Sequence, residues 1–221
     1  MNPALRNEYL AAMGLEAWRA RKRAPDSATA GVAREAGYDW TQLEQRVAEC
    51  TRCSLCNTRI QTVFGVGNLA AEWLIVGEAP GAEEDRRGEP FVGRAGQLLN
   101  SMLRAVGLQR DEVYIANILK CRPPGNRDPS PEEAAQCLPY LEQQIALLKP
   151  KILLAVGRIA AQTLLRTDAS LARLRLQVHA FGASQVPLVV TYHPAYLLRT
   201  PTDKRKAWAD LYFARGAALS V

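Results

Sequence analysis

The stretch LIVGEAPGAEEDRRGEPFVGRAGQLL, residues 74–99, decides the fold class of this 221-residue chain. A short apolar run ends at a glycine, a loop rich in glycine and proline follows, and a helical pattern closes the stretch. Such a layout often holds a phosphate. This loop, however, carries five carboxylates and neither the GxxxxGK[ST] nor the GxGxxG motif. Because carboxylates repel a phosphate, the loop predicts a different ligand.

The same order of strand, loop and helix continues through the rest of the chain. Four apolar runs predict strands, at residues 73–77, 113–119, 151–157 and 187–193. Helical patterns separate or follow them, at about residues 94–106, 131–148, 158–166 and 203–217. Alternating strands and helices predict right-handed crossovers and an α/β fold, in which four mainly parallel strands are covered on both faces.

The N-terminal segment differs from this pattern. Residues 5–23 carry apolar side chains at roughly helical spacing, and residues 24–37 have the composition of a linker. We therefore predict an accessory helix and linker over residues 1–40, followed by the main domain over residues 41–221. Docking of this helix, simple contact with the core and a partly disordered tail all remain open.

Composition and charge limit the function classes. No apolar run reaches the roughly 18 residues of a membrane span, and the N-terminus lacks the apolar core of a signal peptide, so we predict a cytoplasmic protein without a membrane partner. The net charge of +6 comes from residues 158–206, where eight basic side chains face only Asp168 and Asp203. This segment is either a solvated basic face or a surface for nucleic-acid phosphates.

Polar residues follow the ends of the predicted strands. Glu78, Asn117 and His193 occupy three of these positions, and Gly157 occupies the fourth. Open α/β sheets bind ligands beyond the carboxyl ends of their strands, so an acid, an amide and an imidazole are expected to share one pocket. A polar residue that only caps a strand is the alternative at each position. Phe91, in the loop, is either a plug over the core or a stacking platform for a planar base.

The two histidines are predicted to differ in role. His193 is held at a strand end by Pro194, and a neutral imidazole there could donate to a developing anion. His179 falls in an expected hairpin and is predicted to be structural. After His193, Leu197 and Leu198 place apolar side chains beside the basic Arg199, which suits either intrusion into a base stack or a buried turn.

Five cysteines indicate a metal centre. Cys50, Cys53 and Cys56 form the run CTRCSLC, and Cys121 and Cys137 follow downstream. Because disulfides are rare in the cytosol, clustered thiols favour either tetrahedral zinc or a [4Fe–4S] cluster. The spacing alone leaves open which metal is bound and which cysteine is spare.

Taken together, the motifs GEAPG, EED, PFVG, NILKCRPPGNR and HPAYLLR resemble those of the family-four uracil-DNA glycosylases, over about residues 48–215. The resemblance implies a three-layer α/β/α fold around a short, mainly parallel sheet of four strands. It also implies a structural [4Fe–4S] cluster on Cys50, Cys53, Cys121 and Cys137, with Cys56 spare. The partner it implies is uracil-containing DNA, bound by a monomer.

The resemblance also assigns roles to individual residues. The implied uracil pocket is Gly77, Glu78, Ala79, Phe91, Asn117 and His193, with Glu84 and Asn126 in a second tier. The residues expected to take part in catalysis are Glu78, His193 and Asn126. The DNA-binding residues expected from the apolar wedge and the basic segment are Leu198, Arg199, Lys204, Arg205 and Lys206.

The activity expected from the resemblance is hydrolysis of the N-glycosidic bond of uracil in DNA, which starts base-excision repair. Phe91 would stack on the flipped base, Asn117 would pair with uracil, His193 would stabilise negative charge on O2, and Glu78 would position water. Thymine would be excluded sterically, by Glu78 or Glu84.

Two departures and two alternatives accompany this expectation. The family often has a glutamate where this chain has Ala82. A related branch bonds covalently to DNA through a histidine in a basic insertion, and residues 122–133, RPPGNRDPSPEE, contain neither. We therefore expect hydrolytic turnover. The alternatives are a non-catalytic iron–sulfur module that binds DNA and a zinc-bound nucleotide-binding domain.

Overall fold

The computed structural model describes residues 38–183 and 185–219. The predicted accessory segment, residues 1–40, falls outside this part except for its last three residues, of which Trp40 begins the first described helix. Among the described residues no helix is long and apolar enough to cross a membrane.

The four predicted strands form the centre of the sheet. Their bounds are Trp73–Gly77 (β2), Tyr114–Asn117 (β3), Ile152–Val156 (β4) and Val186–Thr191 (β6). They pair in parallel in the order β3-β2-β4-β6. All four apolar runs are thus confirmed as strands, and every residue of β2, β3 and β4 is buried, as expected for a parallel sheet covered on both faces.

Two short strands extend the sheet from four strands to six. Val66–Gly67 (β1) pairs antiparallel with β3, and His179–Phe181 (β5) pairs antiparallel with β6. Segments of two and three residues are too short to show an alternating pattern, which is why the sequence predicts only four strands. The hairpin expected around His179 is formed by β5 and β6.

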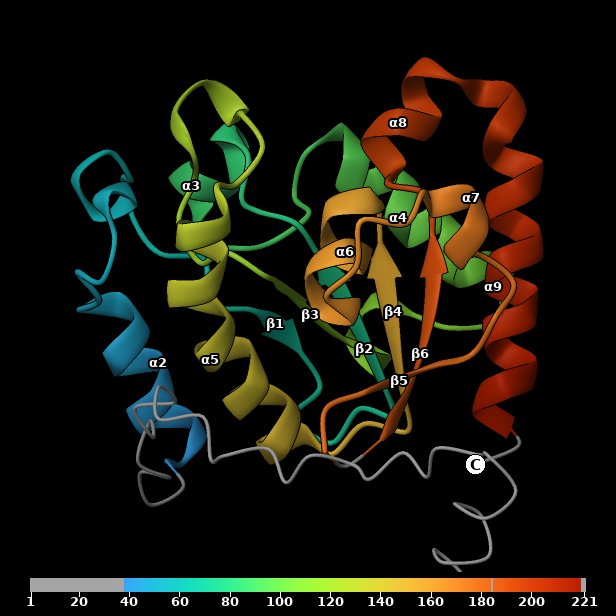
Figure 1. The fold of residues 1–221 in the computed structure, drawn as a ribbon, viewed down its shortest axis with the longest axis horizontal. Coiled ribbons are helices and arrows are strands. Elements are labelled where there is room, and N and C mark those ends of the chain that lie inside the picture. The colour runs from blue at the N-terminus through green and yellow to red at the C-terminus, as the bar shows by residue number, and fades with distance from the viewer. Residues whose placement is uncertain (1–37, 184, 220–221) are drawn as a thin grey trace, which may run out of the picture. The chain divides into compact units, whose positions relative to one another are not determined.

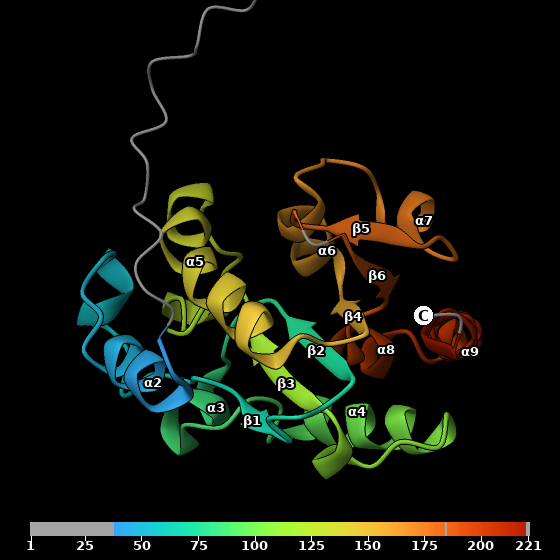
Figure 2. The ribbon, with the colours of Figure 1, turned by 90° about the horizontal axis from the view of Figure 1, so that it is seen from below.

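Helices cover both faces of the sheet (Figure 2). On one face, Leu74, Val76 and other residues of the strands pack against Trp40–Ala48 (α2), Pro131–Leu148 (α5), Arg158–Leu165 (α6) and Leu171–Leu174 (α7). On the other face, Trp73, Ile75 and their neighbours pack against Arg94–Ala105 (α4), Pro194–Arg199 (α8) and Lys204–Leu219 (α9). Alternate residues of each strand therefore enter two separate cores, and the three-layer α/β/α architecture is confirmed.

The remaining elements are short. They are the helix Ala82–Arg87 (α3) and the 3-10 turns Ser54–Asn57 (η1), Arg110–Glu112 (η2), Pro124–Asn126 (η3) and Pro201–Asp203 (η4). Part of the acidic loop is thus helical. Figure 1 shows β4 and β6 pointing toward the end of the molecule that also holds α3 and α8. The carboxyl ends of the parallel strands therefore meet the loops that carry the candidate site residues.

Candidate functional site

A cleft of about 460 Å³ opens at the carboxyl ends of the parallel strands. Its walls contain most of the predicted site residues, namely Glu78, Ala79, Glu84, Phe91, Asn117, Asn126, His193 and Arg199. Other lining residues include Asp128 and Tyr196, which the sequence reasoning did not single out although both stand in motifs it quoted. The parallel sheet places residues from distant parts of the chain in this one cleft because its strands end at the same edge.

Glu78 follows β2 and is only partly accessible to solvent. The pKa of its carboxyl is raised from 4.5 to about 7, chiefly by burial and also by the nearby Asp128, while Arg158 opposes the shift. Asp128 and Arg158 are themselves paired at 2.9 Å. A carboxyl whose pKa lies near neutrality can exchange protons at physiological pH, as a group that activates water must.

Asn117 ends β3 with its side chain buried, and among the described residues its Oδ1 atom has no hydrogen-bond partner. A buried acceptor without a partner is costly, so it points to a ligand that donates to it. The amide approaches the backbone of Gly77 so closely that a Cβ there would lie 2.3 Å from Oδ1. The same Cβ would lie 2.8 Å from ring carbons of Phe91. A glycine at position 77 is therefore required, because any Cβ there would displace the side chains of Asn117 and Phe91.

Phe91 forms an aromatic wall of the cleft. Its backbone has a φ of 54°, an uncommon conformation for a residue other than glycine, and its side chain is buried. The ring lies against His193 with centroids 5.6 Å apart and planes inclined by 32°. Gly96 lets α4 approach this turn, because a Cβ there would meet the Phe91 carbonyl oxygen at 1.7 Å. The loop thus presents a fixed, flat apolar surface beside the imidazole.

His193 is held as a neutral donor. It is the N-cap of α8, and its Nδ1 atom accepts a hydrogen bond of 3.1 Å from the backbone N–H of Ala195. Its pKa is lowered to about 4, chiefly by burial and also by Arg199, while Glu84 opposes the shift. Since Nδ1 accepts, the neutral ring carries its proton on Nε2. The imidazole can therefore donate one hydrogen bond without carrying a charge of its own.

The acidic loop uses its carboxylates in different ways. Glu84 lines the cleft and accepts from the backbone N–H groups of Gly81, Val92 and Gly93, which fixes the loop around Phe91. Glu83 pairs at the surface with Arg86 and Arg87. Asp85 is buried and accepts at 2.9 Å from the backbone N–H of Ile60. Glu84 alone of these three faces the cleft, and most of its bonding capacity braces the loop.

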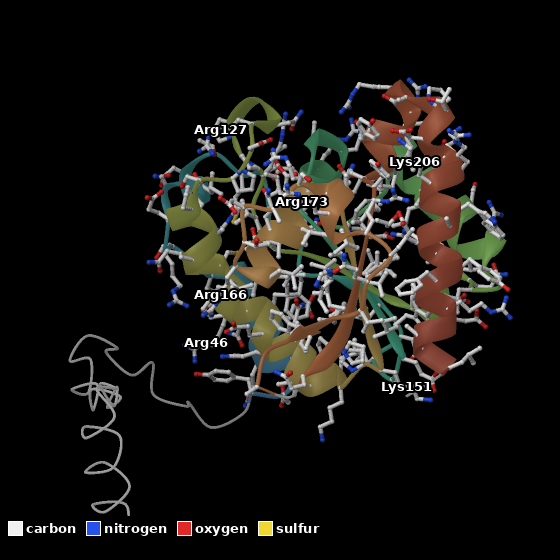
Figure 3. The ribbon with its side chains drawn as sticks, turned by 45° about the vertical axis from the view of Figure 1, so that its right-hand side comes forward. Arg46, Arg127, Lys151, Arg166, Arg173 and Lys206 are labelled. Carbon is white, nitrogen blue, oxygen red and sulfur yellow. The ribbon has the colours of Figure 1, made fainter. Side chains whose placement is uncertain are left out.

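Of the other predicted residues, Asn126 and Arg199 line the cleft, whereas four lie outside its lining: Leu198, Lys204, Arg205 and Lys206. Asn126 accepts at 2.7 Å from Nε of Arg122. Arg199 is exposed. Leu198 is half-buried and Leu197 is part of the core, so Leu198 is the leucine of these two that can contact a ligand. Lys204 and Arg205 are exposed. Figure 3 shows Arg127 and Lys206 at this end of the molecule and Lys151 at the opposite end.

The cysteines converge on a second, small cavity. All five lie in the described part of the chain as free thiols and line this cavity together, with Arg59, Lys120 and Tyr140. Nη1 of Arg59 donates to Cys121 Sγ at 3.1 Å, and the backbone N–H of Lys120 donates to Cys137 Sγ at 3.2 Å. Among the described residues no group of three or more metal-binding side chains is arranged to hold a metal ion. The donor set, thiols with N–H groups directed at sulfur, is nevertheless the one that iron–sulfur clusters use.

Comparisons with known proteins show the family of this chain. The profile of the Uracil DNA glycosylase superfamily matches residues 64–212. A Type-4 uracil-DNA glycosylase of Archaeoglobus fulgidus is 43% identical over 174 residues, which cover 76% of this chain and 87% of that protein. A protein of the same name from Pyrobaculum aerophilum is 42% identical over 187 residues, 82% of this chain and 95% of the relative. In Thermotoga maritima another is 42% identical, over 73% and 84% of the two chains.

Proposed function

Because this chain belongs to the uracil-DNA glycosylase superfamily, we propose that it removes uracil from DNA by hydrolysing the N-glycosidic bond. The observation that carries the proposal is the convergence of Asn117, Phe91 and His193 in one cleft at the sheet edge. A non-catalytic DNA-binding module would have no need of an unpartnered buried amide or of an imidazole held as a neutral donor.

Recognition of uracil rests on Asn117 and Phe91. A base inside a duplex must first be flipped out of the stack, at a cost of a few kcal/mol. The ring of Phe91 then stacks on the base, which contributes about 1–3 kcal/mol. The free Oδ1 of Asn117 accepts from uracil N3–H while its amide group donates to O4. Cytosine presents the opposite pattern and would leave these buried groups mispaired, so the site rejects it.

Cleavage of the bond rests on His193 and Glu78. As the bond breaks, negative charge develops on uracil and positive charge on the sugar. Nε2–H of His193 donates to uracil O2, and because the ring is neutral it stabilises the anion without being deprotonated. Glu78, once ionised, orients the water nucleophile and offsets the charge on the sugar. Asn126 acts with it at the rim, and Glu84 holds the loop that carries Phe91.

A [4Fe–4S] cluster bound by Cys50, Cys53, Cys121 and Cys137 completes the proposal. The cluster would supply cross-links, not a redox step, between the residues after α2, the loop after β3 and helix α5. Cys56 would remain a free thiol. A purified protein with broad absorbance near 400 nm and matching iron and sulfide content supports this assignment, whereas a colourless protein with stoichiometric zinc refutes it.

The DNA backbone would be bound outside the cleft. Arg199 at its rim and the exposed Lys204 and Arg205 beyond it can neutralise phosphates, while Leu198 enters the gap that the flipped base leaves. We also propose that the enzyme acts as a monomer. We propose the cytoplasm as its compartment because reduced thiols are needed to bind the cluster.

The deciding experiment compares the two histidines. Wild type should release free uracil from a uracil-containing oligonucleotide and leave an alkali-labile abasic site. His193→Ala should slow single-turnover excision by about 100- to 1,000-fold, as removal of a donor to a developing anion does elsewhere, with little change in DNA affinity. His179→Ala is the matched control, because His179 lies in β5 outside the cleft lining and its Nε2 atom is 2.9 Å from the carbonyl oxygen of Leu174 at the end of α7. Binding of the DNA without release of uracil by wild type would refute the proposal.

A further inference from the structure

Lys120 is a buried charged residue that the chemistry proposed above does not use. It lies in the loop after β3 and is 1% exposed. Moving an ammonium group out of water costs several kcal/mol unless hydrogen bonds or an opposite charge compensate. A buried lysine therefore needs hydrogen-bond partners, and those partners show which parts of the structure its side chain holds in position.

All three N–H bonds of the ammonium group find neutral acceptors. Nζ donates to the Phe64 carbonyl at 3.1 Å, to the Asn117 carbonyl at 3.0 Å and to Oε1 of Gln144 at 2.6 Å. An ammonium group has three donors, so none is left over. Gln144, which comes from α5, in turn donates to the Phe64 carbonyl at 3.0 Å. The four groups form one buried network at the end of β3, and Gln144 also links it to the Tyr114 hydroxyl, to which it donates at 3.4 Å.

This network fixes the backbone of Asn117, the residue expected to recognise the base. Beyond Asn117 the backbone continues along β2, where Ile118 N–H donates to the Gly77 carbonyl and Leu119 N–H to the Glu78 carbonyl. These bonds fix the N–H side of the turn, and Lys120 fixes the carbonyl of Asn117 itself. Because no hydrogen bond from another described residue holds the Oδ1 of Asn117, the position of this atom depends on the backbone that carries it.

We propose that Lys120 is a positioning residue for uracil recognition, which acts through the main-chain carbonyl of Asn117. The proposal rests on the proposed function. By its hydrogen bond to the Asn117 carbonyl, Lys120 keeps the side-chain amide of Asn117 where it can pair with uracil. Gln144 in turn fixes the ammonium group of Lys120 by accepting a hydrogen bond from it. Without the ammonium group the end of β3 can shift. The donor and the acceptor of the Asn117 amide would then no longer be aligned with those of uracil. A misplacement of this kind far from the reacting bond is known to cost up to about 100-fold in rate.

A double-mutant cycle tests this role. Lys120→Met, Asn117→Ala and the double variant are compared in single-turnover excision at matched iron content, with affinity for uracil-free DNA measured alongside. Lys120→Met should slow excision about 10- to 100-fold at unchanged DNA affinity. Added to Asn117→Ala it should cost less than about twofold more, because the residue it positions is already gone. Losses that multiply in full, or no loss in Lys120→Met, overturn the inference.

Two further variants keep the result interpretable. Gln144→Leu removes one acceptor but leaves the lysine, so it should show a smaller loss with the same dependence on Asn117 even if Lys120→Met fails to fold. Lys151→Met is the matched control, since Lys151 pairs with Glu72 at the opposite end of the strands and should excise uracil at the wild-type rate. An inactive wild type would refute the proposed function. An active wild type with independent Lys120 and Asn117 losses would refute this inference alone.

Discussion

Replacing Glu78 by glutamine should make the protein more stable and less active. The pKa of this carboxyl rises from 4.5 in the unfolded chain to about 7 in the fold, chiefly because of burial. The folded state therefore binds the proton more tightly, and stability falls as the pH rises from about 4.5 to about 7. A shift of this size corresponds to about 3 kcal/mol, and because solvent still reaches the carboxyl we expect about 1–2 kcal/mol in practice.

Thermal unfolding measured by circular dichroism at pH 8 and pH 5 tests this expectation. At pH 8 the Glu78→Gln protein should melt about 2–8 °C above wild type, and most of this gain should vanish at pH 5, where the wild-type carboxyl is protonated in the fold. Glu83→Gln is the matched control, because Glu83 pairs with Arg86 and Arg87 at the surface and should give no gain. If Glu78→Gln did not raise the melting temperature, or raised it equally at both pH values, burial of the Glu78 carboxylate would not be destabilising the fold.

Three further outcomes are expected. Gly77→Ala should cut excision more than about 100-fold, because its Cβ would meet Asn117 Oδ1 at 2.3 Å. A fully active Gly77→Ala enzyme would show that this close approach is not needed. The rate of excision should rise with pH through about 7 as Glu78 ionises, and a pH–rate profile of Glu78→Gln should lose that rise. Lys204→Ala should weaken binding to uracil-containing and uracil-free DNA equally. It should also lower the slope of log K for DNA binding against log salt concentration by about one, whereas an unchanged slope would mean that Lys204 does not contact a phosphate.

The parts of the fold that follow from burial could be predicted from the sequence. The run at residues 73–77 matches β2 to the residue because a central parallel strand must be apolar throughout. One cleft also holds the three polar residues that are predicted at strand ends, Glu78, Asn117 and His193, since the edge at which parallel strands end is common to all of them. These predictions depend on sequence-local patterns and on one topological rule.

Other features depend on loop geometry, which no local pattern encodes. Helix α3 was predicted as loop because AEEDRR has no apolar face, and its end is set by Gly88, whose φ is 75°. The bracing role of Glu84 and the pairing of Asp128 with Arg158 beside Glu78 arise only once distant loops are folded. The burial of Leu197 beside the half-exposed Leu198 likewise depends on how α8 packs.

The two short edge strands have a consequence for the protein at high concentration. Unpaired backbone groups along the edge of a sheet invite the strands of another molecule, and long flat edges are where sheet proteins aggregate. Here one edge ends in two residues, Val66 and Gly67, and the other in three, His179–Phe181. Both run antiparallel to their neighbours, so neither extends the parallel ladder. The four central strands, which hold the cleft together, are thus protected from recruitment into fibrils or mixed sheets.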